Sequence, residues 1–309
     1  MYEDKIQQIR ERGDELITFE EKNKPYPKAK TQDFLNDKQL VILIHGFTSH
    51  GDYMGEELAP FLEREGYQVF FFNYNSPRGI LAAVNTLKDI LKSYDKLTRG
   101  EISRKKVFLI AHSMGGLVAR GFTIDNDAKK FVRGIVMLGT PNNGVFQNKK
   151  DFIKYLIDAG EMLSGAFPKL SVAGCIATKE LCKIDENENQ SIIDILNSDW
   201  CQACELPSIL SVSGGKKFLD FYKSEFKNKV TNDIIQKLIG NEENDGIVTE
   251  SSVNMPLFIE TCTLERYKHC NSYADYSETN HNNIHLNQRV MLKILSWLRK
   301  QNNLLIGVK

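Results

Sequence analysis

The sequence predicts an α/β protein with a mostly parallel β-sheet, helices on both of its faces, and a helical cap inserted after the fourth strand. Two patterns predict this class. Four short apolar runs, of the kind buried on both faces of a parallel sheet, alternate with helical segments between residues 39 and 138. The segment 145–205 then interrupts the alternation before a fifth apolar run begins at Ser208. The alternation is typical of βαβ units, and the interruption marks the cap.

The elements expected around this sheet follow in chain order. The strands are expected over 39–44, 67–74, 106–111, 133–138 and 208–213. The helices are expected over 56–65, 80–97, 115–124 and 287–299. The helix over 80–97 has the clearest pattern, because its apolar residues recur at helical spacing and share one face. These residues are Leu81, Val84, Leu87, Ile90 and Leu91.

Residues 1–38 form a separate N-terminal segment in this interpretation, and residues 39–309 form the main domain. We expect a charged helix over 2–16 and a connector rich in Pro and Lys over 24–30. The first residues lack the apolar core of a signal peptide, which favours a cytoplasmic location. Secretion is the alternative, if a signal peptide has been removed. No stretch reaches the roughly 18 apolar residues of a transmembrane helix.

Composition narrows the classes of partner. The 40 Lys and Arg residues balance the 40 Asp and Glu residues, so the formal net charge is zero. No basic stripe is present, which argues against nucleic acid as a partner. Buried thiols, disulfides and a zinc site all remain open for the cysteines, two of which form a C-x-x-C pair. The six are Cys175, Cys182, Cys201, Cys204, Cys262 and Cys270.

The insert 145–205 begins with an amphipathic pattern between residues 152 and 163. Two interpretations stay open. The apolar face packs against the body of the protein, or it covers an active site and gates an apolar substrate. The second interpretation makes Met162 and Leu163 candidate substrate-binding residues.

One short stretch contains the candidate nucleophile. In AHSMGG, at residues 111–116, Ser113 stands between a buried strand and a helix, with small residues on both sides. A nucleophilic serine needs such a sharp, strained turn to stand clear of the sheet, and only small neighbours tolerate it. The following helix directs N–H groups and its positive dipole end toward developing negative charge. The alternative is that Ser113 caps the helix and the glycines allow close packing.

With these motifs the sequence resembles the α/β-hydrolase fold family, in particular its lipase and esterase branch, over roughly residues 39–299. AHSMG at 111–115 matches the G-x-S-x-G elbow, with alanine in its first position. HGF at 45–47 looks like the family's oxyanion loop, and LGTPNNG at 138–144 looks like a segment common in lipase-like members. NDGIV at 244–248 looks like the loop that bears the catalytic acid.

The resemblance implies a role for each candidate residue. Ser113 is the nucleophile, and Asp245 is the acid, with Asp275 and Glu278 as fallbacks. The backbone N–H groups of Phe47 and Met114 form the oxyanion hole. His45, beside Phe47, is expected to be a buried structural imidazole rather than a base.

The resemblance also assigns the general base to His281 rather than to His285. Lipase-like members often carry an aliphatic residue three positions after the base. Ile284 satisfies this spacing from His281, whereas Gln288 does not satisfy it from His285. His281 also lies in a polar loop, where its ring can reach the serine, and the order Ser113, Asp245, His281 is that of the family.

The predicted function is therefore a serine hydrolase that cleaves carboxylic esters, lipase-like, with apolar acyl substrates and a Ser–His–Asp triad. An acyltransferase, a thioesterase and a catalytically silent binding protein on the same fold remain the alternatives. No metal or cofactor is expected, and the partner is a small ester or lipid, with transient contact to a lipid surface left open. The oligomeric state is not predicted.

Overall fold

The computed structural model describes most of the sheet, its helices and the surroundings of Ser113. The described residues are 13–19, 27–47, 49–148, 176–184, 191–203, 206–215, 244–245, 247–253, 270–275, 279, 281 and 283–306.

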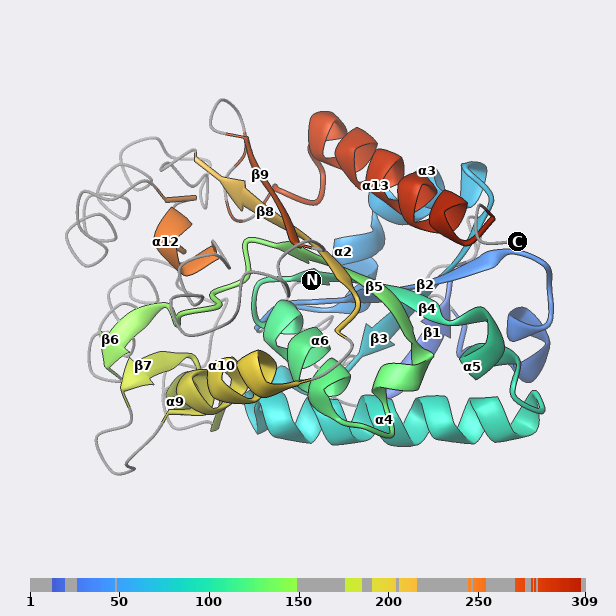
Figure 1. Cartoon of the computed structure of the whole chain (residues 1–309), viewed down its shortest axis with the longest axis horizontal. Coiled ribbons are helices and arrows are strands. Elements are labelled where there is room, and N and C mark those ends of the chain that lie inside the picture. The colour runs from blue at the N-terminus through green and yellow to red at the C-terminus, as the bar shows by residue number, and fades with distance from the viewer. Residues whose placement is uncertain are drawn as a thin grey trace, which may run out of the picture.

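A seven-stranded sheet forms the centre of the described structure (Figure 1). Its strand order is β1-β3-β2-β4-β5-β8-β9, and all neighbours run parallel except β1, which is antiparallel to β3. The expected mostly parallel sheet is therefore confirmed. The strands are β1 (Glu15–Thr18), β2 (Gln39–Ile44), β3 (Tyr67–Asn73), β4 (Val107–His112), β5 (Val132–Leu138), β8 (Ser208–Gly214) and β9 (Cys270–Asp275).

Helices cover both faces of the sheet, as expected. Figure 1 shows α4 and α6 on one side and α13 and α3 on the other. The longer helices are α3 (Leu58–Arg64), α4 (Ile80–Leu97), α6 (Met114–Ile124), α10 (Ile192–Gln202) and α13 (Gln288–Ile306). The short ones are η1 (Thr31–Phe34), α2 (Gly51–Gly55), η2 (Ser76–Arg78), α5 (Glu101–Lys105), η3 (Lys129–Phe131), α9 (Ile176–Glu180) and α12 (Glu250–Val253).

The side chains of each central strand divide between two apolar cores. On β2, Leu40, Ile42 and Ile44 join the core under α4 and α6, while Val41 and Leu43 join the core under α3 and α13. All five are fully buried. Because both faces of β2 are buried, its sequence is a continuous apolar run rather than an alternation of apolar and polar residues. Burying each such side chain contributes about 1.5–3 kcal/mol.

Two parts of the chain depart from the sequence-based expectation. The helix expected over 2–16 is wrong at its end, because Glu15 and Leu16 belong to β1; residues 2–12 lie outside the described part. Antiparallel pairing of β1, the edge strand, with β3 overrides the local helical pattern there. The strand β9 was not predicted, because its sequence CNSYAD lacks an apolar run.

The insert is described only in part. Its described residues form a two-stranded parallel ladder of β6 (Phe146–Asn148) and β7 (Cys182–Ile184), together with α9 and α10. Ile193, Leu196 and Trp200 of α10 are buried in the core that α6 lines. This part of the insert therefore packs against the body. Met162 and Leu163 lie outside the described residues.

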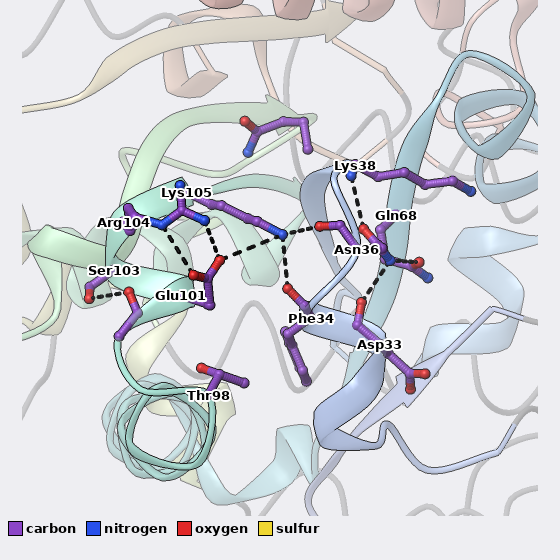
Figure 2. A network of polar contacts seen from close by, with 12 residues as sticks. Asp33, Phe34, Asn36, Lys38, Gln68, Thr98, Glu101, Ser103, Arg104 and Lys105 are labelled. Atoms are coloured by element: carbon purple, nitrogen blue, oxygen red, sulfur yellow. Dashed lines mark hydrogen bonds and ion pairs between the residues drawn. The ribbon is translucent and has the colours of Figure 1, made fainter.

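A network of polar contacts joins residues 31–38, the segment before β2, to the amino edge of the sheet, where the parallel strands begin (Figure 2). Lys105, at the end of α5, donates to the carbonyl oxygens of Phe34, at 3.0 Å, and Asn36. The Asn36 amide donates to Gln68 on β3 at 2.6 Å. Glu101 pairs with Arg104 on the exposed side of α5. These contacts hold residues 34–36 against the starts of β3 and β4.

Among the helices within the described ranges, none has both the length and the apolar character needed to cross a bilayer.

Candidate active site

Ser113 occupies a strained turn at the carboxyl edge of the sheet, where the parallel strands end. It follows the last residue of β4 and precedes α6, with φ of 53° and ψ of −126°. A positive φ is unfavourable for a residue with a side chain, at a cost of about 1–3 kcal/mol. Its N–H donates to the Leu138 carbonyl at 2.9 Å, which ties the turn to the end of β5. The strained strand-to-helix turn that the sequence predicted is therefore present.

The two glycines after Ser113 are required by close packing. A Cβ on Gly115 would lie 2.5 Å from the Ile44 carbonyl oxygen and 2.6 Å from that of His45. A Cβ on Gly116 would lie 1.9 Å from the Thr140 hydroxyl. All three distances are far inside van der Waals contact. The start of α6 can therefore approach the ends of β2 and β5 only without these side chains.

His281 and Asp245 complete a hydrogen-bonded chain with Ser113. The distance from His281 Nε2 to Ser113 Oγ is 3.0 Å, and from His281 Nδ1 to Asp245 Oδ2 it is 2.9 Å. The side chains of His281 and Asp245 are 6% and 1% exposed. Because a carboxylate only accepts, Nδ1 carries the proton, and bare Nε2 accepts from the serine hydroxyl. This is the geometry in which an imidazole can take a proton from a serine.

The Asp245 carboxylate is held by its own loop as well as by His281. Its Oδ1 accepts from the N–H groups of Val248, at 2.8 Å, and Ile247, at 3.1 Å. The His281 backbone N–H donates to the Asp245 carbonyl at 2.8 Å. Gly139 approaches both side chains, since a Cβ there would lie 2.8 Å from Asp245 Oδ2. The ends of β5 and β8 thus place the carboxylate and the imidazole in one buried group.

The predicted oxyanion loop lies against Ser113. A Cβ on Gly46 would be 3.0 Å from the Ser113 Cβ, so the chain entering Phe47 passes directly beside the serine. Met114 directly follows the serine and is the first residue of α6. The roles of the Phe47 and Met114 N–H groups as oxyanion donors stay predictions.

His45 is fully buried, as expected for a structural imidazole. Its Nδ1–H donates to the Gly46 carbonyl at 2.8 Å, and its Nε2 accepts from the Tyr74 N–H at 3.3 Å. Its ring stacks on that of Tyr74 at 4.2 Å between centroids. Burial lowers its pKa to about 4, so it is neutral at pH 7.

Of the alternatives for base and acid, the structure describes His285 and the backbone of Asp275. His285 is fully buried, with its ring 5.5 Å from that of His112, whereas the Ser113 hydroxyl lies 3.0 Å from His281 Nε2. Asp275 ends β9, and Glu278 lies outside the described residues. Ile284, the aliphatic residue that favoured His281, is fully buried in the core under α13.

Sequence reasoning did not anticipate a buried clamp beside this site. The guanidinium of Arg120, on α6, is fully buried and donates to the side-chain oxygens of Asn142, at 3.1 Å, and Asn197, at 2.7 Å. Asn142 donates in turn to the Val253 carbonyl at 3.1 Å. The clamp ties α10 and α12 to the loop after β5. The asparagines in LGTPNNG, unusual in an otherwise apolar region, are the sequence signal for it.

The cysteines differ from one another. Cys201 is disulfide-bonded, whereas Cys182 is a buried thiol whose Sγ donates to the Thr178 carbonyl at 3.1 Å. Within the part of the chain that the structure describes, no three His, Cys, Asp or Glu side chains gather as a metal site.

The chain is similar in fold to several solved structures. The mature form of the lipase BlEst2 from Bacillus licheniformis has a TM-score of 0.56 at 17% identity, covering 84% of this chain and 92% of that chain. A loop variant of the haloalkane dehalogenase DbeA-M1 from Bradyrhizobium elkanii has a TM-score of 0.52 at 11% identity, covering 89% and 93%. Similarity at these identities concerns the fold. No curated protein sequence matches the chain.

A family model places the chain more closely. The model described as serine aminopeptidase, S33, matches residues 36–201. This range is more than half of the 309 residues, and it contains the predicted oxyanion loop and Ser113. With a mostly parallel sheet and a strained serine between β4 and α6, the chain belongs to the S33 serine aminopeptidase family of α/β-hydrolases.

Proposed function

We propose that the protein is a serine hydrolase that cleaves carboxylic esters with apolar acyl groups. One observation carries the proposal: Ser113, His281 and Asp245 form a continuous hydrogen-bonded chain, with distances of 3.0 and 2.9 Å. A strained nucleophile, a base with a defined tautomer and a buried orienting carboxylate are what acyl transfer through a serine requires.

The proposed reaction proceeds through an acyl-enzyme. Ser113 Oγ attacks the ester carbonyl carbon while its proton passes to His281 Nε2, and Asp245 stabilises the imidazolium that forms. The oxyanion accepts from the N–H groups of Phe47 and Met114. As the tetrahedral intermediate collapses, the alcohol leaves with the proton from His281. A water molecule, deprotonated by His281, then attacks the acyl carbonyl and releases the acid and free Ser113.

The choice of an apolar ester rests on three observations. The segment LGTPNNG resembles that of lipase-like hydrolases, and the beginning of the insert is amphipathic. A solved structure of similar fold is named a lipase. An apolar acyl chain would lie against the insert, with Met162 and Leu163 among its contacts, and the natural substrate would be a small ester or a lipid.

Phosphonate labelling combined with a graded substrate panel tests the proposal. A fluorophosphonate probe should label the wild-type protein, while Ser113→Ala should not be labelled and should lose about four to six orders of magnitude in turnover. Ser93→Ala, an exposed serine on α4, serves as the control and should label fully. The panel comprises p-nitrophenyl esters of increasing chain length and amino-acid p-nitroanilides. Faster turnover of the anilides than of every ester would overturn the ester assignment.

A further inference from the structure

His112, the residue immediately before Ser113, has no role in the proposed reaction steps, yet it contacts the base. It is the last residue of β4 and is 8% exposed. Its Nε2 lies 2.8 Å from the backbone carbonyl oxygen of His281. The two imidazole rings lie 4.8 Å apart, tilted by 47°. His112 therefore connects the strand that carries the nucleophile with the loop that carries the base.

The partner of His112 determines its tautomer. A carbonyl oxygen only accepts, so Nε2 must carry the proton and donate it. The other ring nitrogen, Nδ1, faces the oxyanion loop: a Cβ on Gly46 would lie 3.2 Å from it. A single neutral imidazole thus lies between the base loop and the oxyanion loop.

The surroundings of His112 keep its ring neutral. Burial is the main cause, and the neighbouring His281, His285 and His45 also disfavour a charge there, so the pKa of His112 lies well below its usual range. This matters because His281 becomes a cation when it accepts the serine proton. A charged neighbour at 4.8 Å would oppose that step, whereas a neutral donor does not.

The backbone of His281 is held from both sides. Its N–H donates to the Asp245 carbonyl at 2.8 Å, and its carbonyl accepts from His112 at 2.8 Å. Its ring nitrogens meet Asp245 and Ser113. Ser113 and His281 are 168 positions apart, so no local chain connection sets their distance. The hydrogen bond from His112 to the His281 carbonyl constrains this distance instead, because His112 is the residue next to the nucleophile.

We propose that His112 is a positioning residue, whose Nε2–H holds the His281 carbonyl and so keeps the His281 ring within hydrogen-bonding distance of Ser113. This inference rests on the proposed serine mechanism and extends it. The residue acts through the base and touches no substrate, so its loss should slow acylation with little effect on substrate binding. A displacement of about 1 Å in a catalytic group costs on the order of 100-fold in rate.

Three variants test the proposal. His112→Leu keeps an apolar side chain of similar size and removes the donor, while His112→Gln keeps an amide N–H that can reach the same carbonyl. His285→Leu is the matched control, because it also removes a buried imidazole from this group. The readout is the second-order rate of fluorophosphonate labelling at Ser113, which needs the base and no knowledge of the natural substrate. Thermal unfolding shows whether each variant is folded.

We expect labelling of His112→Leu to be about 100-fold slower than wild type, and His112→Gln to recover to within about tenfold. His285→Leu should stay within about tenfold of wild type. With an active ester, kcat should fall while KM changes less than about threefold. Equal rates for His112→Leu and His285→Leu, or no recovery in His112→Gln, would overturn the positioning role.

Nitrogen-15 NMR gives a readout apart from reactivity. The His112 ring should be a neutral Nε2–H tautomer at pH 7, and its replacement should change the chemical shifts of the His281 ring. An Nδ1–H tautomer would contradict the assignment. Absence of labelling in the wild type would instead refute the serine mechanism, and the positioning role with it, whereas normal labelling without ester turnover would refute only the ester substrate.

Discussion

The carboxyl and amino edges of the same sheet hold their polar groups in different ways. At the carboxyl edge, Asp245 and His281 are buried and pack against glycine backbone at Gly139. At the amino edge, Lys105 reaches backbone carbonyls through a long side chain, and the Arg104 partner of Glu101 is 67% exposed. Short, buried contacts to backbone leave no room for adjustment, whereas long, flexible side chains can move. Substitutions at the carboxyl edge should therefore have much larger effects.

Loss of the base is expected to have the largest effect. His281→Ala removes the proposed acceptor of the serine proton, so turnover should fall by about four orders of magnitude or more, while His285→Ala should keep roughly a tenth of the activity or more. Single-turnover acylation measures both. A greater loss in His285→Ala than in His281→Ala would move the base to His285.

Gly115→Ala is expected to be the most destabilising small change. Its Cβ would meet the backbone oxygens of Ile44 and His45, which cannot rotate away, so the free energy of unfolding should fall by about 3 kcal/mol. Gly121→Ala, on the same helix, is the control. Its Cβ would meet the ends of the Val84 and Leu196 side chains, which can adjust. Urea unfolding of the two variants should rank Gly115→Ala well below Gly121→Ala.

Glu180 gives the carboxyl edge a dependence on pH. It accepts hydrogen bonds from the backbone N–H groups of Ile80 and Leu81 at the start of α4, and burial raises its pKa to about 7 from 4.5. Between these values the folded chain keeps a proton that the unfolded chain has lost. Its contribution to stability is therefore complete below pH 4.5 and is lost as the pH rises through 7.

Glu180→Gln should remove this dependence. The amide cannot ionise and still offers an oxygen to the start of α4. We expect the free energy of unfolding of wild type to fall by about 2–3 kcal/mol between pH 5 and 8, and that of Glu180→Gln to stay constant. Urea unfolding across that range measures the difference. Glu101→Gln is the control. Because Arg104 lowers the pKa of Glu101, replacing this carboxylate should leave the pH dependence of unfolding between pH 5 and 8 unchanged. Parallel curves for wild type and Glu180→Gln would contradict the burial effect.

Lys105→Met is expected to have the smallest effect. The Met side chain keeps the apolar stem and removes the donor to the Phe34 and Asn36 carbonyls, so stability should fall by about 1 kcal/mol. Phosphonate labelling of Ser113 should be unchanged. A loss as large as that of Gly115→Ala would show that the two edges do not differ as described.

The sequence was most informative where one local pattern decides the structure. The helix expected over 80–97 is α4 with the same bounds, because its apolar stripe is long and regular. The strands β2, β3, β4, β5 and β8 lie within one or two residues of their predicted positions. For β1 and β9 the local pattern is weak, and pairing with a distant strand decides instead.

The same distinction applies to the site. The serine turn could be predicted because strand, glycines and helix are contiguous at 107–124. The order and spacing of motifs pointed to Asp245 and His281, which the structure brings together with Ser113. The Arg120 clamp and the contact from His112 to His281 could not be predicted, because both join positions far apart in sequence. Asn142 lies in the LGTPNNG segment, but neither that segment nor the elbow motif indicates which distant residue is the partner.

The separation of Ser113 from its partners along the chain has a consequence for biosynthesis. The chain emerges from the ribosome N-terminus first, and its early segments begin to fold before the later ones exist. A nascent protein that has completed β2 to β5 and α6 already contains the serine turn, but Asp245 and His281 have yet to be made. The unfinished enzyme should thus be chemically inert. The first appearance of a phosphonate-reactive serine on a ribosome-bound chain would report that the last segment has docked.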